Sequence, residues 1–181
     1  TRQAIEKGLD FWFERSSSIG EGGPLIISYP RDDFCETGTV ALVGLSIIDY
    51  LRTVDAGGGS LSGERRAELE EKLRGYIAYL KAMRLENKHF AARCAIEKRL
   101  KSWKFSPYYD GETMLCLIKA AKYIKGYEDL VPFIEESALP LAKYYTADCW
   151  RRDFDSDQTK GFFQWSCMAF WEYQDAGWKH A

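Results

Sequence analysis

The chain has 181 residues, 46% of them hydrophobic, which is enough for a single domain over residues 1–181 with its own core. Its 25 Lys and Arg residues are balanced by 27 Asp and Glu residues, so the formal net charge is -2 and the basic surface that a nucleic-acid partner requires is excluded. No apolar run reaches the roughly 20 residues that a membrane-spanning helix needs, so no membrane span is expected.

The first half of the chain predicts three helices. A helix is predicted over residues 4–15, because Ile5, Leu9 and Trp12 recur at helical spacing. The Ser- and Gly-rich segment that follows ends this helix, and the β-branched residues 24–29 favour an extended loop or an edge strand. A second helix is predicted to begin between residues 33 and 37 and to end near residue 54. It has apolar residues on nearly every side, which indicates that it is buried.

A Gly-rich linker at residues 56–60 leads to a more charged helix predicted over residues 62–86. The two helices should form an antiparallel hairpin. Residues 88–105 interrupt the helical pattern, and we expect a small β-excursion there.

The second half predicts the same alternation of paired helices and loops. Asp110 is a favourable N-cap for an apolar helix over residues 113–125, and a partner helix follows over residues 128–145. Pro140 lies inside that partner and predicts a kink. A polar loop at residues 148–160 then leads to an aromatic helix over residues 161–175.

These elements predict an all-α fold class of antiparallel helical hairpins with long loops. Residues 35–42 and 110–117 each place an acid and a Thr ahead of an apolar helix, which indicates a loose internal repeat. The first residue is Thr1, so the natural N-terminus is expected upstream, and the chain is expected to form part of a longer protein or to pair with another subunit.

Five cysteines, an odd number without a close pair, favour reduced thiols and a cytosolic setting. Cys116 and Cys167 lie in apolar helical patterns, where a free thiol behaves as a small hydrophobe. Asn87 is the only Asn and is not part of a glycosylation sequon, which agrees with that setting.

Two segments carry a resemblance to a known superfamily. Residues 4–15, the following Gly-rich loop and residues 36–45 resemble the outer-helix, loop and inner-helix step of α/α-toroid proteins, which include terpenoid-cyclase-like barrels and six-hairpin glycosidases. Residues 106–113, Ser-Pro-Tyr-Tyr-Asp-Gly-Glu-Thr, are similar to the loop that starts an inner helix in toroid domains acting on sugars and uronates, such as glucuronyl epimerase C-terminal domains.

The resemblance covers most of the chain and implies an α/α-toroid-like arrangement. In such proteins the inner helices form a ring, and the loops at one mouth form the pocket; these would be residues 32–36, 108–112 and 153–164 here. A complete toroid has more hairpins than this chain supplies, which implies an incomplete ring, a small toroid or a piece of a longer protein.

Acids and tyrosines precede the two buried helices, and they are the predicted catalytic residues. Sugar chemistry needs two carboxylates across a cleft, about 5 to 10 Å apart, one to donate a proton and one to accept it or attack. The predicted set is Asp33, Glu36, Tyr109, Asp110 and Glu112. The alternative is structural, with Asp33 and Asp110 as N-caps and Glu112 complementing a helix dipole.

Aromatic and basic residues near the predicted loops are the candidates for substrate binding. Exposed rings can stack on sugar faces, whereas buried rings fill the core, and a guanidinium can grip a carboxylate with two hydrogen bonds. The predicted binding residues are Arg93, Trp103, Tyr108, Trp150, Arg152 and Trp165.

No cofactor and no metal are expected. The alternating acids of residues 153–157 lack the Gly and the final Glu of an EF-hand, because Gln158 and Gln164 occupy those positions. The two histidines, His89 and His180, are far apart in the sequence, and no zinc spacing is present.

The sequence therefore predicts a carbohydrate-active domain that hydrolyses, epimerises or binds an oligosaccharide or uronate, with a small molecule or oligosaccharide as its ligand. One alternative is a non-catalytic helical module that binds or scaffolds proteins. The other is terpenoid or prenyl chemistry, because residues 32–36 superficially match an acidic magnesium motif. That motif should lie within a helix, and Pro30 argues against one.

Overall fold

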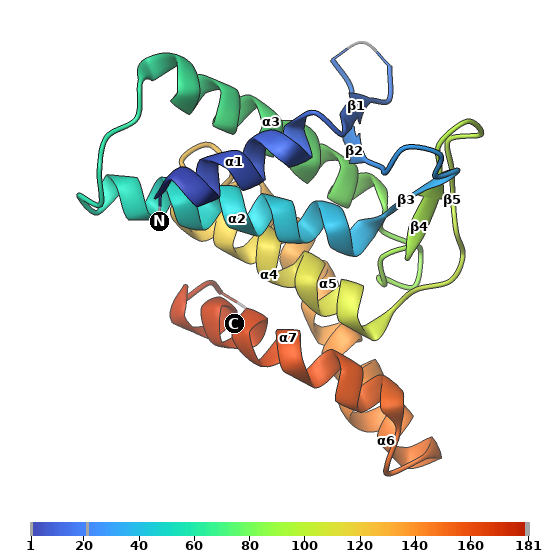
Figure 1. Ribbon diagram of the computed structural model, residues 1–181. Coiled ribbons are helices and arrows are strands. Elements are labelled where there is room, and N and C mark those ends of the chain that lie inside the picture. Colours follow the sequence, from blue (N-terminus) through green and yellow to red (C-terminus); the bar gives the residue numbers. More distant parts are fainter. Residues whose placement is uncertain (1, 21, 180–181) are drawn as a thin grey trace.

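The structure is a computed structural model that describes residues 2–20 and 22–179 (Figure 1). It is mostly helical, as the sequence predicts, with a few short strands. The helices are α1 (Arg2–Phe13), α2 (Thr37–Asp55), α3 (Gly63–Ala82), α4 (Pro107–Tyr123), α5 (Leu130–Lys143), the π-helical turn η1 (Tyr144–Asp148), α6 (Cys149–Arg152) and α7 (Asp157–Asp175).

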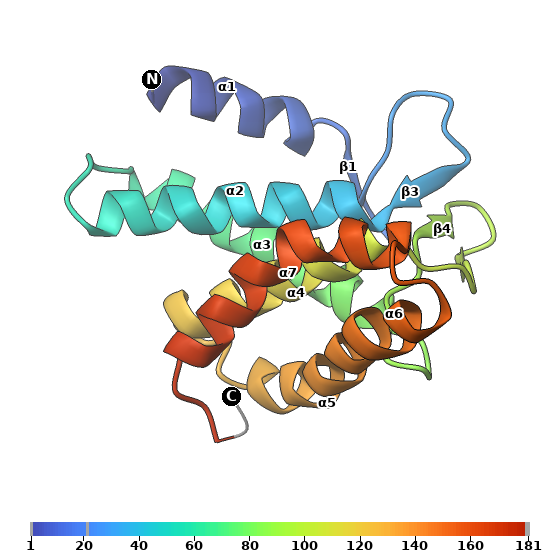
Figure 2. The ribbon, with the colours of Figure 1, turned by 90° about the horizontal axis from the view of Figure 1, so that it is seen from below.

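The helices α2, α4 and α7 lie side by side, with α4 in contact with both of the others, and all three begin at the same end of the molecule (Figures 1 and 2). Glycines allow the close approach. A Cβ at Gly44 would lie 2.8 Å from Cys116 Sγ, and a Cβ at Gly111 would lie 2.7 Å from Trp165 Cβ. Helices α1 and α3 pack on α2, and α5 packs on α4.

The helix α2 is apolar on nearly every side because other elements cover it. Most of its side chains are buried, among them Val40, Ile47 and Leu51. Among the described residues, α2 alone has the length and composition of a helix that could cross a membrane, and 67% of that stretch is buried inside the fold. Such burial is usual for the core helix of a soluble protein.

Short strands form two antiparallel sheets. The strands β1 (Ser16–Ser18) and β2 (Leu25–Ile27) make one, and β3 (Phe34–Glu36), β4 (Arg93–Ala95) and β5 (Leu100–Lys101) make the other in that order. The predicted edge strand and the β-excursion are both confirmed, whereas β1 and β3 were not predicted. The register places Cys35 opposite Cys94 and Glu36 opposite Arg93, which brings two predicted site residues together.

Several predicted boundaries were wrong. The helix α4 begins at Pro107, with Ser106 at the N-cap, so Asp110 lies inside the first turn and is not a cap. The predicted polar loop is partly helical, since it contains the last residue of η1, the whole of α6 and the first four residues of α7. Pro140 lies inside α5, and the irregular π-helical turn follows four residues later.

The five thiols are free. Cys116 is fully buried against α2, as predicted for a small hydrophobe in the core. Cys167 is exposed on α7, so its predicted place in an apolar environment was wrong.

Candidate functional site

The N-terminal ends of α2 and α4 bring a carboxylate and a phenol together. Glu36 ends β3 and stands just before α2, but its side chain makes no capping bond to that helix. Instead, Tyr109 Oη in the first turn of α4 donates a hydrogen bond to Glu36 Oε2 over 2.8 Å. The Glu36 side chain is 37% exposed, and Arg93 Nη2 lies 3.7 Å from its other oxygen. The Arg93 guanidinium also stacks over the Phe34 ring.

Glu112 follows Tyr109 by three residues, so the two share one side of α4. Glu112 is only 6% exposed, and its Oε2 is enclosed without a hydrogen-bond partner among the described residues. Because burial disfavours the charged form, the pKa of Glu112 is raised to about 7. A substantial fraction of this carboxyl therefore holds a proton at neutral pH.

Gly38, in the first turn of α2, allows the side chains of Tyr109 and Glu112 to approach the backbone of that helix. A Cβ at this position would lie closer than 3.0 Å to the Tyr109 ring and to Glu112 Oε2. Glu36, Tyr109 and Glu112 thus surround one point of α2, and we call these three residues the acid–tyrosine cluster.

The two carboxylates of the acid–tyrosine cluster have different surroundings. Glu36 is partly open to solvent and has a phenol and a guanidinium beside it, whereas Glu112 is enclosed without a donor. Burial and the hydrogen bond to Glu36 raise the pKa of Tyr109 to about 12, so its hydroxyl remains a donor. Such an arrangement can supply one carboxylic acid and one carboxylate at the same pH.

A cavity of about 240 Å³ lies beside Glu36. It is smaller than the roughly 300 Å³ at which small-molecule pockets begin, so it has room for part of a ligand. Its lining combines aromatic and polar side chains, and Asp32 Oδ2 accepts a hydrogen bond from the Tyr29 main chain over 3.3 Å. Glu112 does not line it.

Asp110 was predicted as catalytic, but the structure places it in a buried network apart from this cluster. Its Oδ1 accepts a hydrogen bond from the Phe90 main chain over 2.7 Å. Its Oδ2 accepts one from Tyr145 Oη and lies next to His89 Nδ1, each at 2.6 Å. Burial raises the pKa of Asp110. The network ties the segment before β4 and the π-helical turn to α4, and its internal donors occupy both oxygens.

The sequence patterns did not predict that His89 and Tyr145 would contact Asp110. His89 is buried and stacks on Phe105 with ring centroids 3.8 Å apart. The one available signal was the position of His89 beside the apolar run Phe90-Ala91-Ala92, where a His needs a polar partner.

Asp33 is exposed, and its carboxylate makes no hydrogen bond or ion pair within the described part of the chain. Its main-chain oxygen accepts a hydrogen bond from Ile96, which extends the pairing of β3 with β4. Asp32 and Asp33 precede a strand, so they do not share a helix face as a helical magnesium motif requires.

The predicted binding residues are dispersed. Of these predicted binding residues, only Arg93 forms an ion pair with the acid–tyrosine cluster in the part of the chain that the structure describes. Trp103 and Trp150 are exposed on separate segments, and Arg152 contacts Tyr144 and Cys149. The other two stabilise the packing of α4 on α7: Tyr108 lies against Gly161 and Trp165 lies against Gly111.

The acidic segment before α7 is exposed, and Lys160 pairs with Asp155 over 2.7 Å. No group of three or more His, Cys, Asp or Glu side chains in residues 2–20 and 22–179 is arranged to hold a metal. His180 lies outside the described residues.

Comparisons with protein-family models, with curated proteins and with solved structures found no match to this chain.

Proposed function

We propose that this chain is a carbohydrate-active domain of helical hairpins in an α/α-toroid-like arrangement, and that the acid–tyrosine cluster performs acid–base chemistry on an oligosaccharide or uronate. The observation that supports this proposal most directly is the pair of carboxylates around Tyr109, one open and hydrogen-bonded and the other enclosed. Most glycoside hydrolysis uses a pair of carboxyl groups, and sugar epimerisation needs a positioned acid and base.

The toroid-like part of the proposal has support from the helix order. The helices α2, α4 and α7 begin at one end and lie next to each other, and each follows a helix on the outside of this row: α1, α3 and α5 (Figures 1 and 2). The sequence resemblance of residues 36–45 and 106–113 to inner-helix starts falls on α2 and α4. This chain would supply an arc of the ring.

In the proposed chemistry Glu112 is the proton donor and Glu36 is the carboxylate that accepts a proton or attacks the sugar. The enclosed carboxyl holds a proton near pH 7, but only 6% of the Glu112 residue is exposed, so the proposal requires its carboxyl to turn toward the cavity beside Glu36 when a sugar binds. Tyr109 positions Glu36 through its hydrogen bond. Arg93, on the exposed side of Glu36, would bind a substrate carboxylate.

The test is a panel of oligosaccharides with and without uronate units, assayed for new reducing ends and for deuterium uptake from solvent at sugar carbons. With a substrate from this panel, Glu36→Gln and Glu112→Gln should each lower turnover by about 10²-fold or more, which is the usual contribution of a general acid or base. Asp33→Asn is the matched control and should keep the wild-type rate. Unchanged turnover in both Gln variants would remove the acid–base assignment.

A second candidate, a protein-binding helical module, is favoured by one surface. Phe163 and Trp171 on α7 are 67% and 64% exposed, and Met168 lies between them in sequence and is also exposed. Exposed apolar side chains gathered on one helix often mark a contact surface. If no sugar of the panel binds or reacts, while Phe163→Ser and Trp171→Ser together abolish a measured protein interaction, this second function is the correct one.

A further inference from the structure

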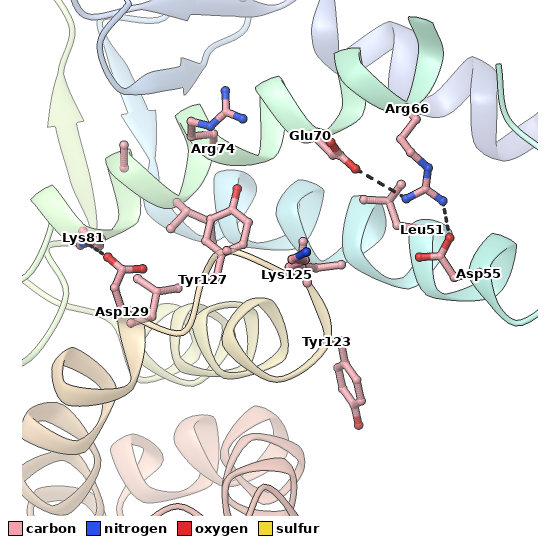
Figure 3. A pocket seen from close by; sticks show the side chains of 15 residues that line it. Leu51, Asp55, Arg66, Glu70, Arg74, Lys81, Tyr123, Lys125, Tyr127 and Asp129 are labelled. Carbon is pink, nitrogen blue, oxygen red and sulfur yellow. Dashed lines mark hydrogen bonds and ion pairs between the residues drawn. The ribbon is translucent and has the colours of Figure 1, made fainter. Parts of the chain in front are cut away.

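A groove of about 620 Å³ runs between α3 and the turn that joins α4 to α5 (Figure 3). The residues Arg66, Glu70, Arg74 and Ile77 recur on one side of α3 and form one wall. The groove lies at the C-terminal ends of α2 and α4, whereas the acid–tyrosine cluster lies at their N-terminal ends. It shares no lining residue with the cavity beside Glu36.

Ion pairs occupy the two ends of this groove (Figure 3). At one end Arg66 contacts Asp55, and its other nitrogen lies 3.5 Å from Glu70 Oε1. At the other end Lys81 Nζ lies 3.6 Å from Asp129 Oδ2. The cations at both ends are therefore already neutralised by acids of the protein.

The middle of the groove holds two cations without such acids. Within the described part of the chain, neither Arg74 nor Lys125 has an acidic group at ion-pair distance, and the Tyr127 hydroxyl has no hydrogen-bond partner. In Figure 3 the Tyr127 ring stands between the α4–α5 turn and α3, with its hydroxyl directed toward α3. Burial raises the pKa of Tyr127 to about 12, so the hydroxyl remains a donor.

The rest of the lining is apolar in the same region. Ala78 from α3 and Ile124 at the end of α4 are partly exposed there and contribute hydrocarbon surface, with the buried Leu51, Ile77 and Leu130 behind them. A volume of about 620 Å³ is within the range of small-molecule sites, which combine apolar walls with a few polar groups. The groove thus has a cationic centre and an apolar wall. A ligand that fits both carries a negative charge and a hydrocarbon part.

We propose that this groove binds a small organic carboxylate with an apolar body, whose carboxylate lies among Arg74, Lys125 and Tyr127. Four cations and three acids line the groove, which leaves one positive charge and fits a monoanion. A phosphate monoester carries a charge of about -1.5 to -2 at pH 7 and fits this balance less well. The proposal is independent of the sugar chemistry proposed for the acid–tyrosine cluster.

Octanoate is a suitable probe, with calorimetric titration of the full chain as the measurement. We expect one octanoate per chain, and at least about tenfold weaker binding of neutral octanamide and of inorganic phosphate, since each lacks one of the two required groups. Absence of octanoate binding at millimolar concentration would overturn the proposal, and so would equal binding of octanamide or of phosphate.

Variants locate the binding. The double variant Arg74→Gln with Lys125→Gln should weaken octanoate binding by at least about tenfold, and Tyr127→Phe by several-fold, with unchanged circular dichroism because all three changes keep the apolar wall. Lys98→Gln removes an exposed cation in the β4–β5 turn, outside the groove, and should bind like the wild type. If the double variant binds octanoate as tightly as the wild type does, the ligand lies elsewhere and the assignment is refuted.

Discussion

Tyr109 Oη donates a hydrogen bond to Glu36 Oε2 over 2.8 Å, and this contact joins the first turn of α4 to the residue that precedes α2. The two residues are 73 positions apart in the sequence. The bond therefore fixes the relative position of two buried helices at the end where the proposed chemistry takes place.

Tyr109→Phe removes this hydrogen bond and keeps the ring. We expect the free energy of unfolding to fall by about 1 kcal/mol, because a partly exposed carboxylate loses a donor. Urea denaturation measures the change. Tyr108→Phe is the control: this neighbouring tyrosine is exposed, its hydroxyl makes no hydrogen bond within the described part of the chain, and the change should cost almost nothing. Equal losses in the two variants would show that the Tyr109–Glu36 bond does not stabilise the fold.

Asp110→Asn tests the buried network. The new amide places an N–H₂ group either at the Oδ1 position, which accepts a hydrogen bond from the Phe90 main chain, or at the Oδ2 position, which accepts one from Tyr145 Oη, so at least one buried donor loses its acceptor. We expect a loss of about 2 to 4 kcal/mol in the free energy of unfolding. Asp33→Asn, on an exposed acid that was predicted for the same catalytic set, should change stability by less than about 0.5 kcal/mol. A small effect of Asp110→Asn would mean that the network is not structural.

Gly38→Ala tests the close contact at the acid–tyrosine cluster. The added methyl group would lie closer than 3.0 Å to the Tyr109 ring and to Glu112, so it should displace both and cost about 1 to 3 kcal/mol. Gly8→Ala in α1 meets nothing within 4 Å and should instead stabilise the chain by up to about 1 kcal/mol, as a Gly-to-Ala change in a helix does. Thermal unfolding compares the two. If Gly38→Ala behaves like Gly8→Ala, the helices do not approach as described.

Glu112 also predicts how stability depends on pH. Its pKa is about 7 in the folded chain against 4.5 as the ordinary value, so between these pH values the unfolded chain loses a proton that the folded chain keeps. The contribution of Glu112 to stability is thus complete below pH 4.5 and decreases as the pH rises to 7, by about 3 kcal/mol in total. Glu112→Gln should remove this decrease and be more stable than the wild type at pH 8, whereas Glu36→Gln should retain it. A constant stability difference between wild type and Glu112→Gln from pH 4 to 8 would contradict this.

Local patterns in the sequence were sufficient to predict most of the helices. The α2–α3 hairpin follows from helical periodicity on both sides of a Gly-rich linker, and the burial of α2 follows from its apolar residues on nearly every side. The repeated placement of an acid before a buried helix also indicated that Glu36 and Glu112 would lie at the same end, as they do.

Long-range pairing could not be predicted. The strand β3 has three residues, and its partner β4 lies more than fifty residues later, so no local pattern indicates that Glu36 would stand opposite Arg93. The helix that was predicted to begin at residue 113 begins at Pro107. Asp110 was therefore predicted to be an N-cap, whereas it lies inside α4 and is a buried hydrogen-bond acceptor. The exposure of Trp103 and Trp150 agrees with their basic neighbours in the sequence, but their positions on separate segments depend on packing, which composition does not specify.

The titration of the Glu112 side chain tests the proposed chemistry most directly, because a proton donor at neutral pH requires a raised pKa. Carboxyl ¹³C resonances of the full chain can be followed from pH 3 to 9, with Glu112 assigned by the signal that Glu112→Gln removes. We expect a midpoint near 7 for this resonance. A midpoint at or below 4.5 would show a carboxylate that is ionised at neutral pH, and Glu112 would then not be the acid.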